Sequence, residues 1–456
     1  MAPTVRSFSA EFEPLDLVER FPEFYPGLLE SGGAAAAARP DSRYDILPIA
    51  SGESLQLDCD GRLSGVHAGA AGFLGSLESW WRDLHAGNLR QASIGSAPQL
   101  PFSGGWLVYL GYELAGEIES CLNLPRSPDP IVALALRAPA AWLRDRDTGK
   151  AWLVAEEGAA DLLNDFERRV AEIAAAAQPP LAEFKVVEED PEKFLAAVRG
   201  ALEYTAAGDV YQTNLSRLWQ AAAVGSVSPV AVYKRLRATN PAPFAAILRH
   251  GDFAVLSSSP ERLVEVRDGR ISTRPIAGTR PRGATPQDDA MLIRSLLENE
   301  KERAEHVMLI DLERNDLGRV CVGGSVHVDE YMSVESYAHV HHIVSNVSGR
   351  LRAGTSPIAV IRALFPGGTI TGCPKIRTMQ VIAELESGGR GAYTGSIGYL
   401  NRDGSCDFNI LIRTLTAHGA AFKFRAGAGV VADSIATQEL AETRAKAEGL
   451  LRALLQ

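Results

Sequence analysis

The sequence of 456 residues lacks the features of secreted, membrane and zinc-finger proteins. Its five cysteines are scattered and odd in number, and no two form a CxxC pair, which excludes a disulfide framework and a cysteine-based zinc site. The first residues contain no apolar core of the kind found in signal peptides. No stretch of about 18 apolar residues suggests a membrane span. We therefore expect a cytoplasmic protein with reduced thiols and no membrane partner.

A basic excess is also missing, because 46 Lys and Arg residues face 56 Asp and Glu residues for a net charge of −10. A surface that binds nucleic acid needs a local excess of positive charge, so we expect no nucleic-acid partner. Arg and Lys side chains, backbone amides or a metal can still bind a small anion inside an acidic protein. Hydrophobic residues make up 46% of the chain, enough for a substantial core.

The chain is longer than the ~100–200 residues of an ordinary domain, which indicates one large unit or two interlocked ones. An irregular N-terminal part spans residues 1–178 and should end with a helix over 159–177, since Gln178 is followed by two prolines. A second part, 186–456, intertwines with the first and opens with a helix capped by Asp190. Strand-like segments alternate with further helices, which predicts an α+β fold. These helices are expected near 286–306, 356–364, 374–386 and 437–454.

Two segments carry glutamates at helical spacing. Glu298, Glu302 and Glu305 are spaced i, i+4 and i+7, so one helix would place them on one face. Glu439 and Glu442 are spaced i, i+3, with a lysine one turn later. Pattern alone favours solvated helix faces with Glu–Lys pairs of ~0.2–0.5 kcal/mol each. The alternative is a Mg²⁺ ion held by a few carboxylates from two helices.

Three glycine-containing segments could bind an anion or lie at the surface. In residues 274–283 (RPIAGTRPRG), we expect a turn at the end of a strand that exposes the Gly278 and Thr279 amides beside three arginines. Residues 365–375 (FPGGTITGCPK) combine paired glycines with a proline at a helix start. Residues 427–432 (GAGVVA) fit the dinucleotide fingerprint formally. Because the following residues prolong an extended segment, nucleotide binding is not expected there.

These motifs occur in the same order as in the chorismate-binding enzymes, which the sequence resembles densely from about residue 190 to residue 456. The resemblance implies two packed, largely antiparallel β-sheets with helices outside, as in anthranilate synthase component I, with the active site in a deep cleft. It extends weakly into the N-terminal part through SRYDIL and GYELAGEIE. The densely matching segments are PIAGTRPRG, RAEHVMLIDLERNDLGRV, HHIVS, PGGTITGCPK, GSIGYL, IRTL and AGAGVVADS.

The resemblance also assigns roles to individual residues. Mg²⁺ would be bound by Glu305 and Glu442, with Glu302 and Glu439 as further candidates. Glu261 matches the general acid that protonates the departing C4 hydroxyl of chorismate, and burial near an anion suits a carboxyl group for that task. The other matches are His342 and Lys446 beside the reacting groups, and Gly278, Thr279, Tyr393, Arg413, Gly427, Ala428 and Gly429 around the substrate carboxylates.

The nucleophile is indicated by Gln212, because relatives that use water carry a lysine base at this position. Ammonia is therefore expected to attack, and GDVYQTNLSR, PGG and GSIGYL resemble aminodeoxychorismate synthase large subunits. Ala277 departs from this pattern, since many of those enzymes carry a nucleophilic lysine there and PIAGT resembles anthranilate synthase component I, the alternative. The sequence contains no glutaminase nucleophile motif, so ammonia is expected from a separate glutaminase subunit. A non-catalytic activator of such a subunit is the alternative of another class.

Three short segments resemble the tryptophan pocket of the same family, which implies bound tryptophan as a further ligand. They are LLES, SRYD and NPAPF. Their pocket candidates are Ser31, Arg43, Tyr44, Asp45, Pro243 and Phe244.

Overall fold

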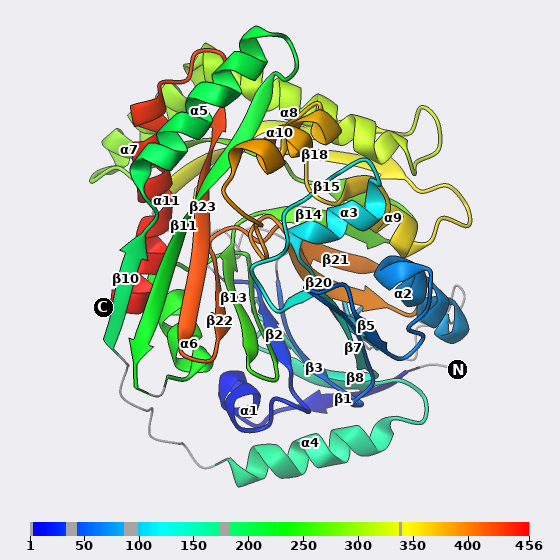
Figure 1. Ribbon diagram of the computed structural model, residues 1–456. Helices are drawn as coiled ribbons and strands as arrows, with labels where there is room; N and C mark the ends of the chain where they lie inside the picture. The colour runs from blue at the N-terminus through cyan, green and yellow to red at the C-terminus, as the bar shows by residue number, and fades with distance from the viewer. Residues whose placement is uncertain are drawn as a thin grey trace.

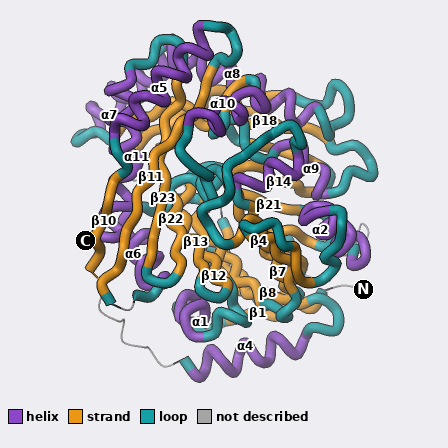
Figure 2. Tube along the Cα trace, viewed as in Figure 1, coloured by secondary structure: helices purple, strands orange, loops and turns teal. Residues whose placement is uncertain are grey.

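The computed structural model describes residues 3–32, 43–85, 99–173, 183–225, 227–336 and 340–455. Two large β-sheets form its centre, and all their strand pairs are antiparallel. Helices surround the strands (Figures 1 and 2). This arrangement confirms the predicted α+β fold of two packed sheets with helices outside. Among the described residues, no helix is long and apolar enough to cross a membrane.

The first sheet has 12 strands and collects segments from both ends of the chain. Its order is β1 (Thr4–Phe8), β9 (Ala151–Ala155), β8 (Ala140–Asp145), β3 (Tyr44–Ile49), β2 (Gly27–Glu30), β12 (Phe244–His250), β13 (Phe253–Ser259), β22 (Thr414–His418), β23 (Ala421–Val430), β11 (Gln212–Val224) and β10 (Glu183–Glu188), with β19 (Gly372–Cys373) paired to β11.

The second sheet has 11 strands and is also assembled from distant segments. Its order is β16 (Ile276–Pro281), β18 (Val340–Arg350), β15 (Arg270–Thr273), β14 (Arg262–Arg267), β21 (Cys406–Asn409), β20 (Ser396–Asn401), β6 (Gly105–Leu110), β7 (Ile131–Ala138), β4 (Ser54–Asp58) and β5 (Leu63–Gly65), with β17 (His327–Ser336) paired to β18.

Both sheets therefore combine strands from the two parts that the sequence suggests. In the second sheet, β20 pairs directly with β6, which joins residues about 290 positions apart through the pair Ser396 and Leu110. The proposed boundary at residue 178 lies outside the described residues. Whether the parts fold separately therefore stays a prediction, while their strands share both sheets.

Apolar side chains fill three layers. Between the sheets, Leu107 and Leu134 of the second sheet pack with Leu248 and Val255 of the first. The outer face of the first sheet packs under α1, α6 and α11, and that of the second packs under α2 and α9. The helices are α1 (Pro14–Arg20), α2 (Gly72–Leu84), α3 (Ala115–Ile118), α4 (Ala160–Glu172), α5 (Pro191–Ala206), α6 (Pro229–Thr239), α7 (Pro286–Glu298), α8 (Glu300–Gly318), α9 (Pro357–Leu364), α10 (Lys375–Leu385) and α11 (Ala436–Leu455), with a short 3₁₀ helix at Tyr112–Leu114.

Local sequence signals explain where several elements begin. The Asp190 side chain accepts a hydrogen bond from the Glu192 amide and caps α5, as predicted. The segment after Gly427 continues as a strand to Val430 and α11 begins only at Ala436, so the formal dinucleotide fingerprint has no helix at its glycines.

The prediction of one helix through residues 286–306 was wrong. Asn299 ends α7, adopts an extended backbone and caps α8 by accepting a hydrogen bond from the Glu302 amide at 3.0 Å. Glu298 therefore closes one helix, while Glu302 and Glu305 lie in the first turns of the next. The expected single face of three glutamates does not exist.

Candidate active site

Glu261 lies where the chain leaves β13 of the first sheet and enters β14 of the second. Only 5% of the residue is exposed. Burial raises the pKa of Glu261 to about 7, against the lowering effects of the Thr369 hydroxyl, the Ile276 amide, Lys446 and Arg413. At neutral pH a large share of the Glu261 carboxyl groups therefore carries a proton, which is the state a general acid requires.

His342 lies on β18. Its Nδ1 lies 3.2 Å from the Gly278 carbonyl oxygen and 3.0 Å from the Thr279 hydroxyl. A carbonyl oxygen can only accept, so the Gly278 contact places the proton on Nδ1 and leaves Nε2 as the acceptor in the neutral ring. Burial and the nearby Arg413 lower the pKa of His342 to about 3, so the imidazole is neutral at physiological pH.

A bulge in β16 determines where Gly278 and Thr279 lie relative to His342. The β16–β18 register shifts between Ala277 and Thr279, and Gly278 at the bulge has φ +69°. A side chain at Gly278 would collide with Glu302 Oε2 at 2.4 Å. The positive φ favours glycine at this position, and a larger residue would also displace the end of the Glu302 side chain.

The predicted strand-ending turn at residues 274–283 was wrong. The segment is a bulged strand, because the ladder to β18 continues through Pro281. Its arginines are also already held by carboxylates, which offset their charge. The pairs are Arg274 with Glu330 and Glu335, Arg280 with Glu302, and Arg282 with Asp289.

The floor of the cleft is a glycine-rich strand. A Cβ atom at Gly427 would lie 2.5 Å from the Tyr393 hydroxyl and 2.8 Å from Asn214 Oδ1. A Cβ atom at Gly429 would lie 2.5 Å from Gln212 Nε2. The two glycines of β23 thus let polar groups from neighbouring elements lie directly over the backbone. Gln212 and the sequence-predicted Tyr393, Gly427 and Gly429 come together here, with Ala428 between the glycines on the strand.

Two cations border the same space. Arg413 has φ +51°, an uncommon backbone conformation for a residue with a side chain, and its charge acts on both Glu261 and His342. Lys446 on α11 donates a hydrogen bond to the Gly427 carbonyl at 3.1 Å and contacts Glu442 at 2.6 Å. A dianionic ligand would meet positive charge on the Arg413 side and on the α11 side of the cleft.

The four candidate metal ligands lie on α8 and α11. Burial raises the pKa of Glu305, and the charges of Glu302, Glu439 and Glu442 raise it further against Lys301. Their oxygen donors suit Mg²⁺. Three of them are already paired with cations: Glu302 with Arg280, Glu305 with Lys301 and Glu442 with Lys446. Within the described ranges, no three acidic, His or Cys side chains converge at ligand distances.

A buried cluster behind Glu261 was not assigned from the sequence, although it comes from two quoted motifs. Burial raises the pKa of Glu313 on α8 to about 8, and Asp316 and Glu261 add to the increase. Lys375 forms an ion pair with Asp316. Helix α8 is rich in charged residues, so spacing alone does not distinguish the buried Glu313 and Asp316 from its solvated charges.

Several buried polar atoms around this cleft have no hydrogen-bond partner within the part of the chain that the structure describes. An orphaned buried polar atom costs about 1–3 kcal/mol, which a bound ligand or water can recover. These atoms are Gln212 Oε1, Thr213 Oγ1 and Asn214 Oδ1.

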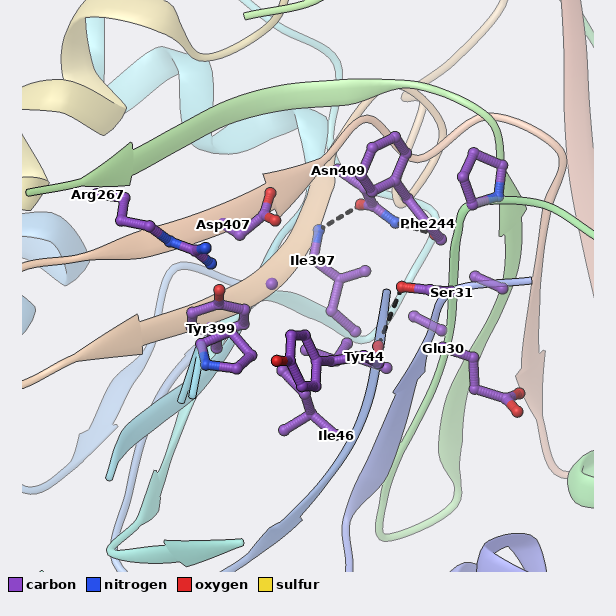
Figure 3. A pocket seen from close by; sticks show the side chains of 16 residues that line it. Glu30, Ser31, Tyr44, Ile46, Phe244, Arg267, Ile397, Tyr399, Asp407 and Asn409 are labelled. Atoms are coloured by element: carbon purple, nitrogen blue, oxygen red, sulfur yellow. Dashed lines mark hydrogen bonds between the residues drawn. The ribbon is translucent and has the colours of Figure 1, made fainter. Parts of the chain in front are cut away.

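A second cavity, of about 570 Å³, lies between β2, β12 and β20–β21 (Figure 3). Ser31, Tyr44, Pro243 and Phe244 line it. These are four of the six residues predicted for a tryptophan pocket. Tyr399 and Asp407 also line the cavity, and Asn409 lies beside Phe244, as Figure 3 shows. The cavity combines aromatic and aliphatic walls with a few polar groups, as small-molecule sites do.

Arg43 and Asp45 do not line this cavity, contrary to expectation. Asp45 follows Tyr44 along β3, so alternation points its side chain to the other face, whereas the Arg43 guanidinium group lies 5.4 Å from the centre of the Tyr44 ring. Arg43 instead pairs with Asp145, and Asp45 accepts hydrogen bonds from Arg144 at 2.7 Å and Arg146 at 2.6 Å. Arg43 and Asp45 therefore form ion pairs with neighbouring charged residues and do not line the cavity.

The neutral His342 should make the protein sensitive to acid. Its pKa is lowered from 6.5 to about 3 in the folded state, so the unfolded state binds more protons below pH 6.5 and stability falls with pH. From pH 7 to pH 5 the free energy of unfolding should fall in the wild type and fall by about 2 kcal/mol less in His342→Gln. Urea unfolding at the two pH values measures both changes. His327→Gln, at an exposed position on β17, is the control. Equal losses in both variants would contradict the buried neutral state.

Comparisons with known proteins agree with this geometry. The family described as chorismate binding enzyme matches residues 38–452. The chain is 41% identical over 415 residues to aminodeoxychorismate synthase of Streptomyces griseus (85% of this chain, 56% of that protein), so it spans about half the length of that relative. It is 43% identical over 366 residues to aminodeoxychorismate synthase component 1 of Bacillus subtilis, covering 77% of each.

Relatives named anthranilate synthase component 1 match at similar identity. Among solved structures, anthranilate synthase component I from Streptococcus pneumoniae superposes with a TM-score of 0.79 at 31% identity, covering 90% of this chain and 92% of that chain. The family match includes the whole second sheet, every strand of the first sheet except β1 and β2, and every group that borders the cleft. The chain therefore belongs to the family of chorismate-binding enzymes.

Proposed function

We propose that the chain is the large subunit of an aminodeoxychorismate synthase, which replaces the C4 hydroxyl of chorismate by ammonia to give 4-amino-4-deoxychorismate for p-aminobenzoate and folate synthesis. The observation that carries the proposal is the buried Glu261 carboxyl group, whose raised pKa leaves it partly protonated at neutral pH, in a chain that has Gln212 where water-using relatives carry a lysine base. Glu261 supplies the proton that the departing hydroxyl needs. Gln212 offers no amine to activate water, so ammonia is the nucleophile that the site accepts.

The surrounding residues divide the remaining tasks. Arg413 and the Tyr393 hydroxyl hold the substrate carboxylates, together with the amides of Gly278 and Gly427–Gly429. Burial raises the pKa of Tyr393 to about 12, so its hydroxyl stays a donor. His342, neutral and fixed by Gly278 and Thr279, orients the C4 side of the substrate. Lys446 adds positive charge at the floor.

The Glu261 proton moves to the C4 hydroxyl as the C–O bond breaks, and water leaves. Ammonia forms the new C–N bond, and the proton that its nitrogen gives up restores the Glu261 carboxyl group. Ala277 has no nucleophile, so this reaction proceeds without a covalent enzyme adduct at that position.

Magnesium fits the carboxylates at the helix ends. Glu305 and Glu442 would hold it, with Glu302 and Glu439 as further ligands. The proposal is supported by the pKa values of Glu305 and Glu439, which are raised by burial and, to a smaller extent, by the neighbouring carboxylates. When bound, the ion supplies Lewis-acid charge to the substrate carboxylate. The ammonia would come from a separate glutaminase subunit or from solution. The second cavity is a candidate site for tryptophan, because four residues of the resembling segments line it.

Anthranilate synthase component I remains the second candidate, favoured by Ala277 in PIAGT. A non-catalytic activator of a glutaminase is disfavoured, because such a protein would not need a protonated Glu261, a neutral His342 and Arg413 in one buried cleft.

Replacing a metal ligand should weaken both metal binding and turnover. We expect Glu442→Gln and Glu305→Gln to reduce the Mg²⁺-dependent rate by about 10²–10³-fold, because several kcal/mol of transition-state stabilisation depend on the ion. Binding of Mn²⁺, followed by electron paramagnetic resonance, should weaken in parallel. Glu448→Gln, farther along α11, should match the wild type. A Glu442→Gln enzyme with unchanged rate and Mn²⁺ affinity would refute the site.

Removing the acid should separate binding from catalysis. Glu261→Gln should bind chorismate normally but lose about 10²–10⁴-fold in rate, the range for a general acid. Because the protonated carboxyl is the active form and its pKa is about 7, the wild-type rate should decline as pH rises through 7. If the variant loses chorismate binding and keeps its turnover per bound substrate, Glu261 is a binding residue instead.

The product identifies the reaction. With chorismate, Mg²⁺ and ammonia, we expect 4-amino-4-deoxychorismate, converted to p-aminobenzoate only after a lyase is added. Mass spectrometry of the protein should show no adduct at Ala277. Fluorescent anthranilate with released pyruvate, in the absence of a lyase, would establish the alternative.

A further inference from the structure

The residue after Glu261 is a buried arginine on the opposite side of the strand. Arg262 begins β14, and its guanidinium side chain is only 1% exposed. Successive side chains of an extended chain point to opposite faces, so Glu261 faces the cleft while Arg262 faces away from it. There the guanidinium group lies 4.9 Å from the centre of the Phe244 ring.

Arg262 is bound by a carboxylate of the neighbouring strand. Its Nε donates to Asp407 Oδ1 at 2.9 Å and its Nη2 donates to Asp407 Oδ2 at 2.8 Å. This bidentate geometry fixes both the distance and the orientation of the two groups. Glu265 Oε2 lies 3.4 Å from Arg262 Nη1, so a second carboxylate pairs with the guanidinium group.

The backbone at Glu261 depends on the same strand. The Ile410 amide donates to the Glu261 carbonyl at 3.0 Å, and Ser259 Oγ accepts from the Glu261 amide at 3.2 Å. The β14–β21 register shifts between Arg262 and Val264, so the ladder is irregular at this point. The Arg262–Asp407 pair therefore supplies a fixed connection between β14 and β21 where regular ladder pairing is interrupted.

We propose that Arg262, through its bidentate pair with Asp407, is a positioning residue that holds the Glu261 carboxyl group buried and aimed into the cleft. This role rests on the proposed function, in which Glu261 is the proton donor.

The charged groups that face Glu261 are Lys446 of α11, Arg413, and Glu313 of α8. All three remain when Arg262 is changed, so their effects are common to wild type and variant. Burial is the largest cause of the raised pKa of Glu261. If its backbone loosens, water reaches the carboxyl group and the pKa falls toward 4.5. The protonated form is then lost at lower pH.

The test uses Arg262→Lys, which keeps the buried positive charge but not the bidentate fork, and Asp407→Asn, which keeps the shape of the acceptor side chain. For both we expect kcat to fall at least about 10-fold with unchanged chorismate affinity. The alkaline limb of the pH–rate profile should move to lower pH by about one unit. Arg270→Lys, a mostly exposed arginine of the same sheet that pairs with Asp329, is the matched control.

Titration of the Glu261 carboxyl by difference infrared spectroscopy, wild type against Glu261→Gln, gives a readout without turnover. It should show the same shift in the folded Arg262→Lys protein. A loss of rate without movement of the alkaline limb or of the infrared titration would reduce Arg262 to a structural residue and overturn the proposal. Unchanged kcat and pH profile would also overturn it. If Glu261→Gln itself retains the wild-type rate, the proposed acid is wrong, which is a separate outcome.

Discussion

The removal of water from Glu261 is the constraint on which the rest of the site depends. A carboxyl group that titrates near neutrality needs burial without a close cation to ionise it, and Glu261 meets this condition where one sheet passes into the other. Arg413 and Lys446 lower its pKa without overcoming the effect of burial. The same desolvation keeps His342 neutral. One environment thus produces a proton donor and an uncharged imidazole within a single cleft.

The topology explains how such a cleft can be rigid. Both sheets are built from segments far apart in the chain, as in the pairing of β20 with β6, so neither wall can move without breaking ladders on both sides. The cleft groups lie on β11, β16, β18 and β23, on α8 and α11, or on the loops that join other helices and strands (Figure 1). Sites on such elements are held more precisely than sites on surface loops, which suits the small tolerance of proton transfer for displacement.

Much of the fold could be predicted from local signals and from the order of motifs. The Asp190 cap and the strand through Gly427–Gly429 follow from residue chemistry that acts over a few positions. The break at Asn299 was missed because a capping asparagine inside a helical pattern also fits a continuous helix. The bulge at Gly278 and the partners of Arg274, Arg280 and Arg282 depend on other strands and helices.

The site residues divide in the same way, into those that local signals predict and those that depend on contacts with distant segments. Spacing brought Glu302 and Glu305 to one helix, but the ion pair of Glu302 with Arg280 is a tertiary contact that no spacing encodes. Glu313 was overlooked because its charge suggests solvent, whereas the fold buries it beside Asp316 and Lys375. Arg43 and Asp45 are the chain neighbours of Tyr44, which lines the cavity, yet their own side chains pair with Asp145 and Arg144 instead.

The central claim is that one cleft between the sheets holds substrate, metal and acid together. A crystal structure of the Glu261→Gln protein with chorismate and Mn²⁺ tests it most directly, because slowed turnover preserves the complex and manganese is located by its anomalous signal. We expect the manganese peak between Glu305 and Glu442, and the chorismate ring over Gly427 with its C4 hydroxyl beside the side chain at position 261. Manganese bound elsewhere, or chorismate found only in the cavity lined by Tyr44 and Phe244, would contradict the account.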